Sequence, residues 1–153
     1  MKILYVTTFN NKLYNATGRD MIESFVKYKT EGDLLIAHED SLDEVIPHHR
    51  KFIFHDLEED PFLHSWLREN EDIIPVDLGG NFDGTYKGMA KFNHRASQWF
   101  RKIVALNRAM EIKSDYEAIV FLDSDTVVNK HLPSSKVDEI FDGHSMFYHL
   151  GEH

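Results

Sequence analysis

Cysteine is absent from this chain of 153 residues. Its absence excludes a disulfide framework, a cysteine-ligated zinc site and a thiol nucleophile. Long apolar runs are missing as well, because no stretch approaches the roughly 18 apolar residues that a membrane span requires. The apolar start at residues 1–6 turns polar at Thr7 and is too short for a signal peptide. We therefore expect a soluble, cytoplasmic protein with no membrane span.

Positive charge is also scarce, since 17 Lys and Arg face 26 Asp and Glu and leave a formal net charge of −9. An acidic chain gains no electrostatic attraction to nucleic acid or to an anionic membrane, so neither is expected as a partner. The hydrophobic fraction of 42% and the aromatic fraction of 12% favour a packed core over disorder. The length favours a single domain over residues 1–153.

Strand and helix patterns alternate along the chain, which predicts an α/β fold with a mostly parallel sheet and helices on both faces. The continuous apolar run at residues 118–122 is typical of a central strand covered on both faces. Asp60 and Pro61 have the pattern of a helix start. Further expected strands are residues 3–6, 34–37 and 51–54, with a short edge element at 73–76 and a strand-like segment at 146–148. The expected helices are residues 19–29, 61–70, 93–113 and 137–141, and residues 77–92 read as a loop.

Two of these helices have a predicted buried face. At about 100° per residue, the apolar positions of each helix fall on one side. In the helix at residues 19–29 these positions are Met21, Ile22, Phe25 and Val26. In the helix at residues 93–113 they are Ala96, Trp99, Phe100, Ile103, Leu106 and Met110.

The chemistry is concentrated at Asp123-Ser124-Asp125, directly after the apolar run. Ligands of open α/β sheets bind outside the carboxyl ends of the strands. Two carboxylates two residues apart at such an end can reach one hard cation, and Mg²⁺ or Mn²⁺ shares oxygen ligands of this kind with substrate phosphates. A turn-forming acidic pair is the alternative interpretation.

Residues 119–128 resemble the DxD segment of nucleotide-sugar glycosyltransferases of the GT-A fold. The upstream order is similar too, with a first strand ending in Thr7-Thr8-Phe9, a second ending in His38-Glu39-Asp40, and a basic helix before the DxD. The resemblance implies a Rossmann-like GT-A sandwich that moves a sugar from a nucleotide-sugar donor, most commonly a UDP-sugar, to a glycan or glycoprotein acceptor. It implies Mn²⁺ or Mg²⁺ as cofactor, with Asp125 and Asp123 as ligands. It also implies donor contacts from Asp123, Thr7, Thr8 and Phe9.

The helix at residues 93–113 carries the candidate phosphate ligands. Arg95 and Lys102 are seven residues apart and project within about 20° of each other, on one border of the apolar stripe. Arg101 is predicted to point almost opposite the stripe, toward solvent. A cation at a core border can reach a pocket rim while its stem packs on apolar surface. We therefore favour Arg95 and Lys102 over Arg101 as contacts with the donor phosphates, with ordinary surface cations as the alternative.

The 28 residues after Asp125 are fewer than related glycosyltransferases usually have there. We therefore expect the donor-binding half to be present and the acceptor half to be largely missing, and no catalytic residue can be assigned. His149 or His153 could add a metal ligand only if the chain folds back. Asn81 and Asp83 could lie near the sugar if the loop forms a rim over the donor.

Two other functions fit parts of the sequence. Asp123-Ser124-Asp125-Thr126-Val127 also matches the DxDxT signature of haloacid-dehalogenase-type phosphatases, in which the first Asp is a nucleophile and the second a general acid. That signature normally ends the first strand, whereas here four or so elements precede it. The other alternative is a non-catalytic module that binds a nucleotide or a nucleotide sugar.

Overall fold

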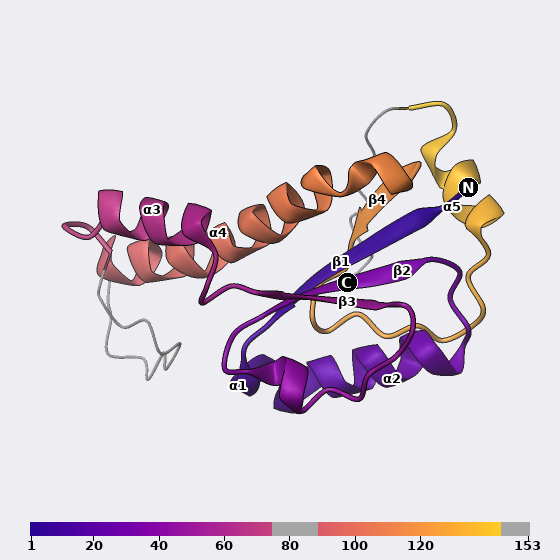
Figure 1. Ribbon diagram of the computed structural model, residues 1–153, viewed down its shortest axis with the longest axis horizontal. Coiled ribbons are helices and arrows are strands. Elements are labelled where there is room, and N and C mark those ends of the chain that lie inside the picture. Colours follow the sequence, from indigo (N-terminus) through magenta and orange to yellow (C-terminus); the bar gives the residue numbers. More distant parts are fainter. Residues whose placement is uncertain (75–88, 145–153) are drawn as a thin grey trace.

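The computed structural model describes residues 1–74 and 89–144, apart from the side chains of residues 89–94. It contains a four-stranded sheet in the order β3-β2-β1-β4, in which all neighbouring strands are parallel (Figure 1). The predicted α/β class and the four predicted strands in these segments are confirmed, and the sheet is parallel throughout. The strands are β1 (Ile3–Phe9), β2 (Asp33–His38), β3 (Phe52–Asp56) and β4 (Ala118–Phe121).

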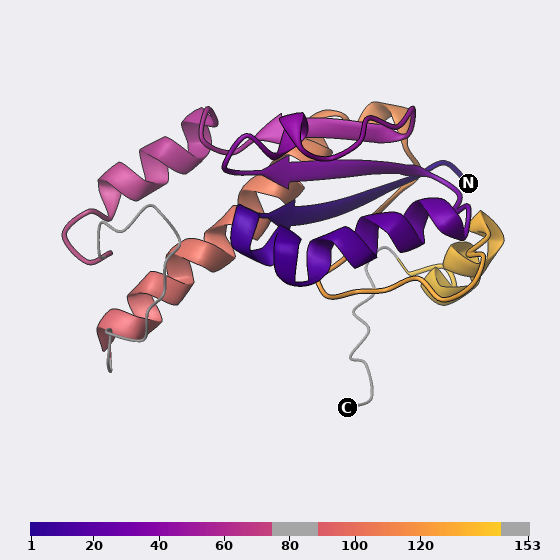
Figure 2. The ribbon, with the colours of Figure 1, turned by 90° about the horizontal axis from the view of Figure 1, so that it is seen from below.

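Side chains of β1 alternate between two hydrophobic clusters, because successive residues of a strand point to opposite faces of the sheet. Ile3 and Tyr5 pack with side chains of helix α2 (Arg19–Lys27). Leu4 packs with side chains of helices α3 (Pro61–Glu69) and α4 (Met89–Glu111). Figure 2 shows α2 running beneath the strands, and α3 and α4 lie away from it. Both faces of the sheet are thus covered by helices.

Among the described strands, β4 lies at an edge, where it pairs with β1 alone, and not at the predicted centre. Its continuous apolar run does reflect the predicted cover on both faces. Ile119 and Phe121 pack against one cluster, whereas Val120 and Leu122 pack against the other. An apolar run therefore indicates two covered faces, which an edge strand can also have, and does not reveal how many neighbouring strands it pairs with.

The first helical segment begins earlier than predicted. Helix α1 (Asn11–Leu13) passes into a π-helical turn (Tyr14–Gly18) and then into α2. The side chain of Asn10 caps this segment by accepting a hydrogen bond of 2.9 Å from the backbone N–H of Leu13. An apolar periodicity that starts at Met21 could not reveal these polar opening turns.

Gly18 lies inside this helical segment and allows close packing on β1. A Cβ atom at this position would lie 2.6 Å from a ring carbon of Phe9, which is closer than real contacts allow. The predicted apolar face of α2 is largely confirmed, because Met21, Ile22 and Phe25 are buried. Val26 is exposed instead, at the margin of that face.

The other predicted elements fall into three groups. Helix α3 begins as expected, with the Asp60 carboxylate accepting hydrogen bonds from the N–H groups of Phe62 and Leu63, and α5 (Ser134–Phe141) matches the predicted short helix. Ile73 and Ile74 form no strand. Residues 75–88 and 145–153, which include the rest of that edge element, most of the predicted loop and the segment at 146–148, lie outside the described residues. Two short 3-10 helices complete the described elements, at Leu42–Glu44 and Lys113–Asp115.

Helix α4 begins at Met89, so residues 89–92 are helical rather than loop, and its predicted buried face is wrong. Val104, Ala105 and Ala109 are fully buried against the sheet, whereas Trp99, Ile103 and Met110 are each about half exposed. Small side chains let the helix lie close to the sheet, and the larger apolar side chains are left at its flanks. Part of that flank is used by α3, since Phe100 stacks on Trp66 with ring centroids 4.0 Å apart. None of the described helices has both the length and the apolarity to cross a membrane.

Candidate functional site

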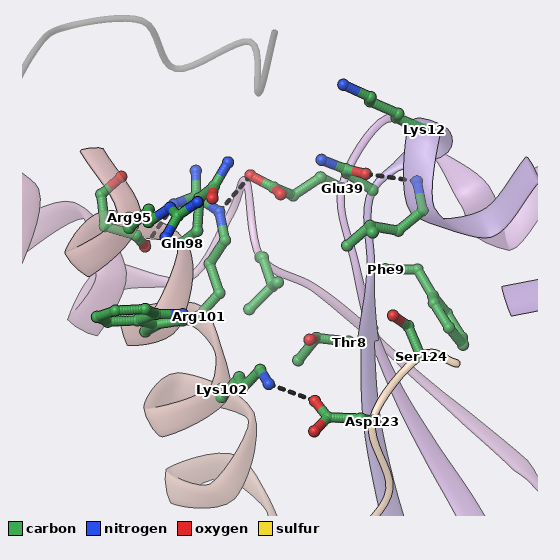
Figure 3. Close-up of a pocket in the computed structure, with 15 residues that line it drawn as sticks. Thr8, Phe9, Lys12, Glu39, Arg95, Gln98, Arg101, Lys102, Asp123 and Ser124 are labelled. Carbon is green, nitrogen blue, oxygen red and sulfur yellow. Dashed lines mark hydrogen bonds and ion pairs between the residues drawn. The ribbon is translucent and has the colours of Figure 1, made fainter. Parts of the chain in front are cut away.

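A pocket of about 400 Å³ opens at the carboxyl edge of the sheet (Figure 3). The chain leaves β1 for β2 and β3 on one side of the sheet and returns to β4 on the other. A reversal of strand order of this kind is where open α/β sheets bind ligands. The strand ends contribute Thr8, Phe9, Asn10, Glu39, Leu57, Asp123 and Ser124 to the lining, α1 contributes Lys12 and Leu13, and α4 contributes Arg95, Ser97, Gln98, Trp99, Arg101 and Lys102.

The charge of this pocket is opposite to that of the chain. Of the described residues, four cationic side chains line it against two carboxylates, an excess of two positive charges in a chain whose net charge is −9. The cations are Lys12, Arg95, Arg101 and Lys102, and the carboxylates are Glu39 and Asp123. A concave site that gathers one sign of charge attracts ligands of the other sign. The pocket is therefore suited to an anionic ligand.

Glu39 and Arg101 form the more buried of two ion pairs in the pocket. The Nε atom of Arg101 donates to a Glu39 carboxylate oxygen at 2.7 Å, and Nη1 donates to the backbone carbonyl of Ser97 at 2.7 Å. Each side chain of the pair is 13% exposed. Burial raises the pKa of Glu39 above its ordinary value, although the Arg101 guanidinium acts in the opposite direction. Arg101 is thus held in one orientation at the pocket.

This position of Arg101 overturns the prediction that it points to solvent. The error follows from the helical phase of α4, because the buried face runs through Ser97, Val104 and Ala105 rather than through the largest apolar side chains. Arg101 lies four residues after Ser97, on the same face. The two predicted phosphate ligands, Arg95 and Lys102, line the pocket as expected, and Arg101 joins them there.

Lys102 and Asp123 form the second ion pair, in which the ammonium of Lys102 contacts an oxygen of the Asp123 carboxylate (Figure 3). Their side chains are 39% and 58% exposed, so this pair is far more open to water than Glu39–Arg101. The Lys102 ammonium also lies 5.5 Å from the centre of the Phe121 ring. The structure thus brings together the predicted basic helix and the first carboxylate of the DxD segment.

The predicted nucleoside contacts at the end of β1 are brought to the pocket in part. Thr8 and Phe9 line it, whereas Thr7 is fully buried and does not. Thr7 lies one residue further inside the strand than Thr8, and its side chain is enclosed by the packed interior. Thr7 is therefore part of the packed interior rather than a direct donor contact.

The second carboxylate of the DxD segment is exposed and stands apart from the pocket lining. Asp125 lies in a turn closed by a 3.0 Å hydrogen bond from the N–H of Thr126 to the carbonyl of Asp123. In the described part of the chain, no group of three or more His, Asp or Glu side chains could hold a metal ion. Mg²⁺ takes only one or two carboxylates when phosphates and water complete its shell. Asp123 lines the pocket and is a ligand of that kind, whereas Asp125 does not line it. The candidates Asn81, Asp83, His149 and His153 lie outside the described residues.

Glu39, Lys12 and Trp99 line the pocket but were not among the predicted site residues. Glu39 directly follows β2, so the rule that placed Asp123 at a strand end also applies to it. Lys12 was missed because its helix was not predicted, and Trp99 because it was expected in the core. The usable signal was the rule that ligands bind at the carboxyl ends of the strands, and it needed to be applied to every strand.

Searches for similarity to known protein families, to curated proteins and to solved structures each found no match. A functional assignment for this chain therefore depends on the pocket itself: its place at the strand ends, its positive charge and its neighbouring carboxylates.

Proposed function

We propose that this chain binds a nucleoside-diphosphate sugar in the carboxyl-edge pocket and acts as the donor-binding part of a metal-dependent glycosyltransferase with a GT-A-like arrangement. A UDP-sugar is the first donor to test. The observation that carries the proposal is the cluster of four cations in the pocket beside the Asp123-Ser124-Asp125 turn. The all-parallel sheet with strand order β3-β2-β1-β4 is consistent with a nucleotide-binding architecture.

The size and charge of the pocket support a diphosphate ligand. Its volume of about 400 Å³ lies within the range of small-molecule sites. A hydrogen bond from a cationic side chain to phosphate contributes about 1.5–3 kcal/mol, and Arg101 is already oriented for such a contact by Glu39 and Ser97. Thr8 adds a hydroxyl between the two ion pairs (Figure 3). The chain's own residues thus provide charge, orientation and a neutral hydrogen-bonding group.

In this proposal a divalent cation is held by Asp123 of the pocket, with Asp125 of the adjoining turn as its second carboxylate. When bound, Mg²⁺ or Mn²⁺ supplies Lewis-acid stabilisation of the charge on a diphosphate leaving group. Arg95, Arg101 and Lys102 would hold the diphosphate against the strand ends, and α4 would shield one side of it from water. A glycan or a glycoprotein is the acceptor class that this proposal implies.

A non-catalytic binding module is the second candidate, and one observation favours it. Both carboxylates that line the pocket in the described part of the chain, Glu39 and Asp123, are ion-paired with cations of α4. A general base must be within reach of the acceptor proton and able to accept it. Neither carboxylate is free for that task while its pair is intact.

Calorimetry with UDP, in Mn²⁺ and in EDTA, tests the proposed metal-dependent binding. We expect Mn²⁺ to tighten UDP binding in the unmodified chain, and Asp125→Asn and Asp123→Asn each to remove that gain. Asp138→Asn, an exposed substitution on α5, is the matched control and should keep it. Equal UDP affinity with and without metal would contradict the metal-dependent proposal.

Multiple-turnover release of UDP from a UDP-sugar in the presence of sugar or glycopeptide acceptors would favour the transferase over the binding module.

A further inference from the structure

The carboxylate assigned to the metal is already in contact with a cation. Asp123 pairs with Lys102, and Lys102 is also one of the side chains assigned to the donor phosphates. We propose that Lys102 and the divalent cation compete for Asp123, so that Lys102 is the counter-ion of this carboxylate until metal occupies Asp123 or a diphosphate draws Lys102 away. This inference rests on the proposed function, because it assumes a metal ligand role for Asp123.

The surroundings of Lys102 allow such an exchange. Its side chain and that of Asp123 are 39% and 58% exposed, and an exposed pair of this kind shifts an equilibrium by no more than about fivefold. Lysine carries its charge on a flexible four-carbon stem, so the ammonium can move without its backbone. That backbone is fixed, since Val104 and Ala105 two and three residues later are fully buried. The movement required is a change of side-chain rotamer in the pocket.

The neighbouring pair shows that the exchange is particular to Lys102. Arg101 donates to both Glu39 and the carbonyl of Ser97, and only 13% of its side chain is exposed. It is therefore held by two contacts at a site with little access to water. Lys102 has one carboxylate partner among the residues that the structure describes, Asp123, which follows β4 and is 58% exposed.

A shared contact of this kind couples the two ligands. Metal binding at Asp123 releases the Lys102 ammonium for phosphate, and phosphate binding by Lys102 releases Asp123 for metal. The first ligand to bind breaks the Lys102–Asp123 pair, so the second ligand binds without that free-energy cost. By linkage, metal raises the affinity for phosphate by the same factor as phosphate raises the affinity for metal. We expect this coupling to contribute roughly two- to fivefold, in addition to any direct contact between metal and phosphate.

Lys102→Met tests the competition because it should change the two affinities in opposite directions. Titration of the variant with Mn²⁺ alone, followed by electron paramagnetic resonance of the free ion, should show binding roughly two- to fivefold tighter than in the unmodified chain. Calorimetry with UDP in EDTA should show binding at least about tenfold weaker. Lys102→Gln should behave in the same way and guards against a folding defect of the Met variant.

Arg95→Met is the matched control, since Arg95 lines the same pocket while the carboxylate of Asp123 pairs with Lys102. It should weaken UDP binding and leave the Mn²⁺ affinity unchanged. An equal gain in Mn²⁺ affinity in Arg95→Met would show a general charge effect and overturn the inference. Mn²⁺ binding that is lost in Asp123→Asn but not tightened in Lys102→Met would overturn the competition and leave the proposed function standing. If neither the unmodified chain nor Lys102→Met binds Mn²⁺, both the competition and the metal-dependent proposed function are overturned.

Discussion

The two ion pairs of the pocket use the same chemistry in different surroundings. Arg101 and Lys102 are neighbours on α4, and each reaches a carboxylate that follows a strand, Glu39 after β2 and Asp123 after β4. Adjacent helical residues project about 100° apart, so one helix can hold two strand ends at once. The Glu39–Arg101 pair is 13% exposed on each side, whereas the Lys102–Asp123 pair is 39% and 58% exposed.

This difference in exposure separates a fixed contact from an exchangeable one. Between the two carboxylate-bearing strands lies β1, whose end brings Thr8 and Phe9 into the pocket. A ligand in the pocket thus meets a rigid cation on its β2 side and a mobile one on its β4 side. A buried charge that loses its partner is costly, but an exposed charge is stabilised by water instead.

The largest expected difference is in stability. Glu39→Ala should lower the free energy of unfolding by about 3 kcal/mol, because it leaves the guanidinium of Arg101 poorly solvated and without its partner. Asp123→Ala should change it by less than about 1 kcal/mol, since Lys102 remains in contact with water. Urea unfolding of the two variants provides the measurement. Equal losses would mean that exposure does not distinguish the pairs.

Much of the fold could be predicted because it depends on patterns local to the chain. The apolar runs located four parallel strands, and Asp60 with Pro61 marked the start of α3. The rule that ligands bind at the carboxyl ends of strands pointed to Asp123, the resemblance to glycosyltransferases added Thr8 and Phe9, and the three residues line one pocket. The assignment of metal and donor to that pocket stays a prediction.

What the sequence did not reveal depends on contacts between distant segments. Strand order cannot be deduced from an apolar run, so β4 was expected at the centre. Which face of α4 is buried depends on how closely the helix lies to the sheet. Close approach favours the small Ala105 at the interface, so the larger and more apolar Ile103 is left half exposed. With the phase wrong, Arg101 was assigned to solvent and its partner Glu39 was missed.

Double-mutant cycles sharpen the comparison by removing both members of each pair. The coupling free energy between Glu39→Gln and Arg101→Met should be about 1.5–3 kcal/mol, as for hydrogen bonds to charged groups. The coupling between Asp123→Asn and Lys102→Met should be about 0.2–1 kcal/mol, as for exposed pairs. Unfolding free energies of the single and double variants give both values. A larger coupling for Lys102–Asp123 would reverse the assignment of fixed and exchangeable contacts.

The pH dependence of the unfolding free energy tests the Glu39–Arg101 pair. The folded chain holds the Glu39 proton to higher pH than the unfolded chain, because burial raises the pKa of this carboxyl above 4.5. More protons are then bound in the folded state above pH 4.5, so the contribution of Glu39 to stability falls as the pH rises through that window. The unfolding free energy of the unmodified chain minus that of Glu39→Gln should therefore decrease from pH 4 toward neutrality. A difference that increases would show that attraction to Arg101 outweighs burial.

The smallest expected effect is the response of the two couplings to salt. At about 1 M ionic strength the Debye length is about 3 Å, so interactions between exposed charges are largely screened, whereas buried pairs are screened much less. The Lys102–Asp123 coupling should therefore fall toward zero between 0.05 M and 1 M NaCl, a change of about 0.5 kcal/mol, because water and ions reach both of its side chains. The Glu39–Arg101 coupling should keep most of its value, since little of either side chain is open to solvent. Repeating both cycles at the two salt concentrations compares the pairs within one protein, so general effects of salt on unfolding cancel. Equal screening of both couplings would show that solvent reaches Glu39 and Arg101 as freely as it reaches Lys102, and Arg101 would then have to be regarded as a second exchangeable cation of the pocket.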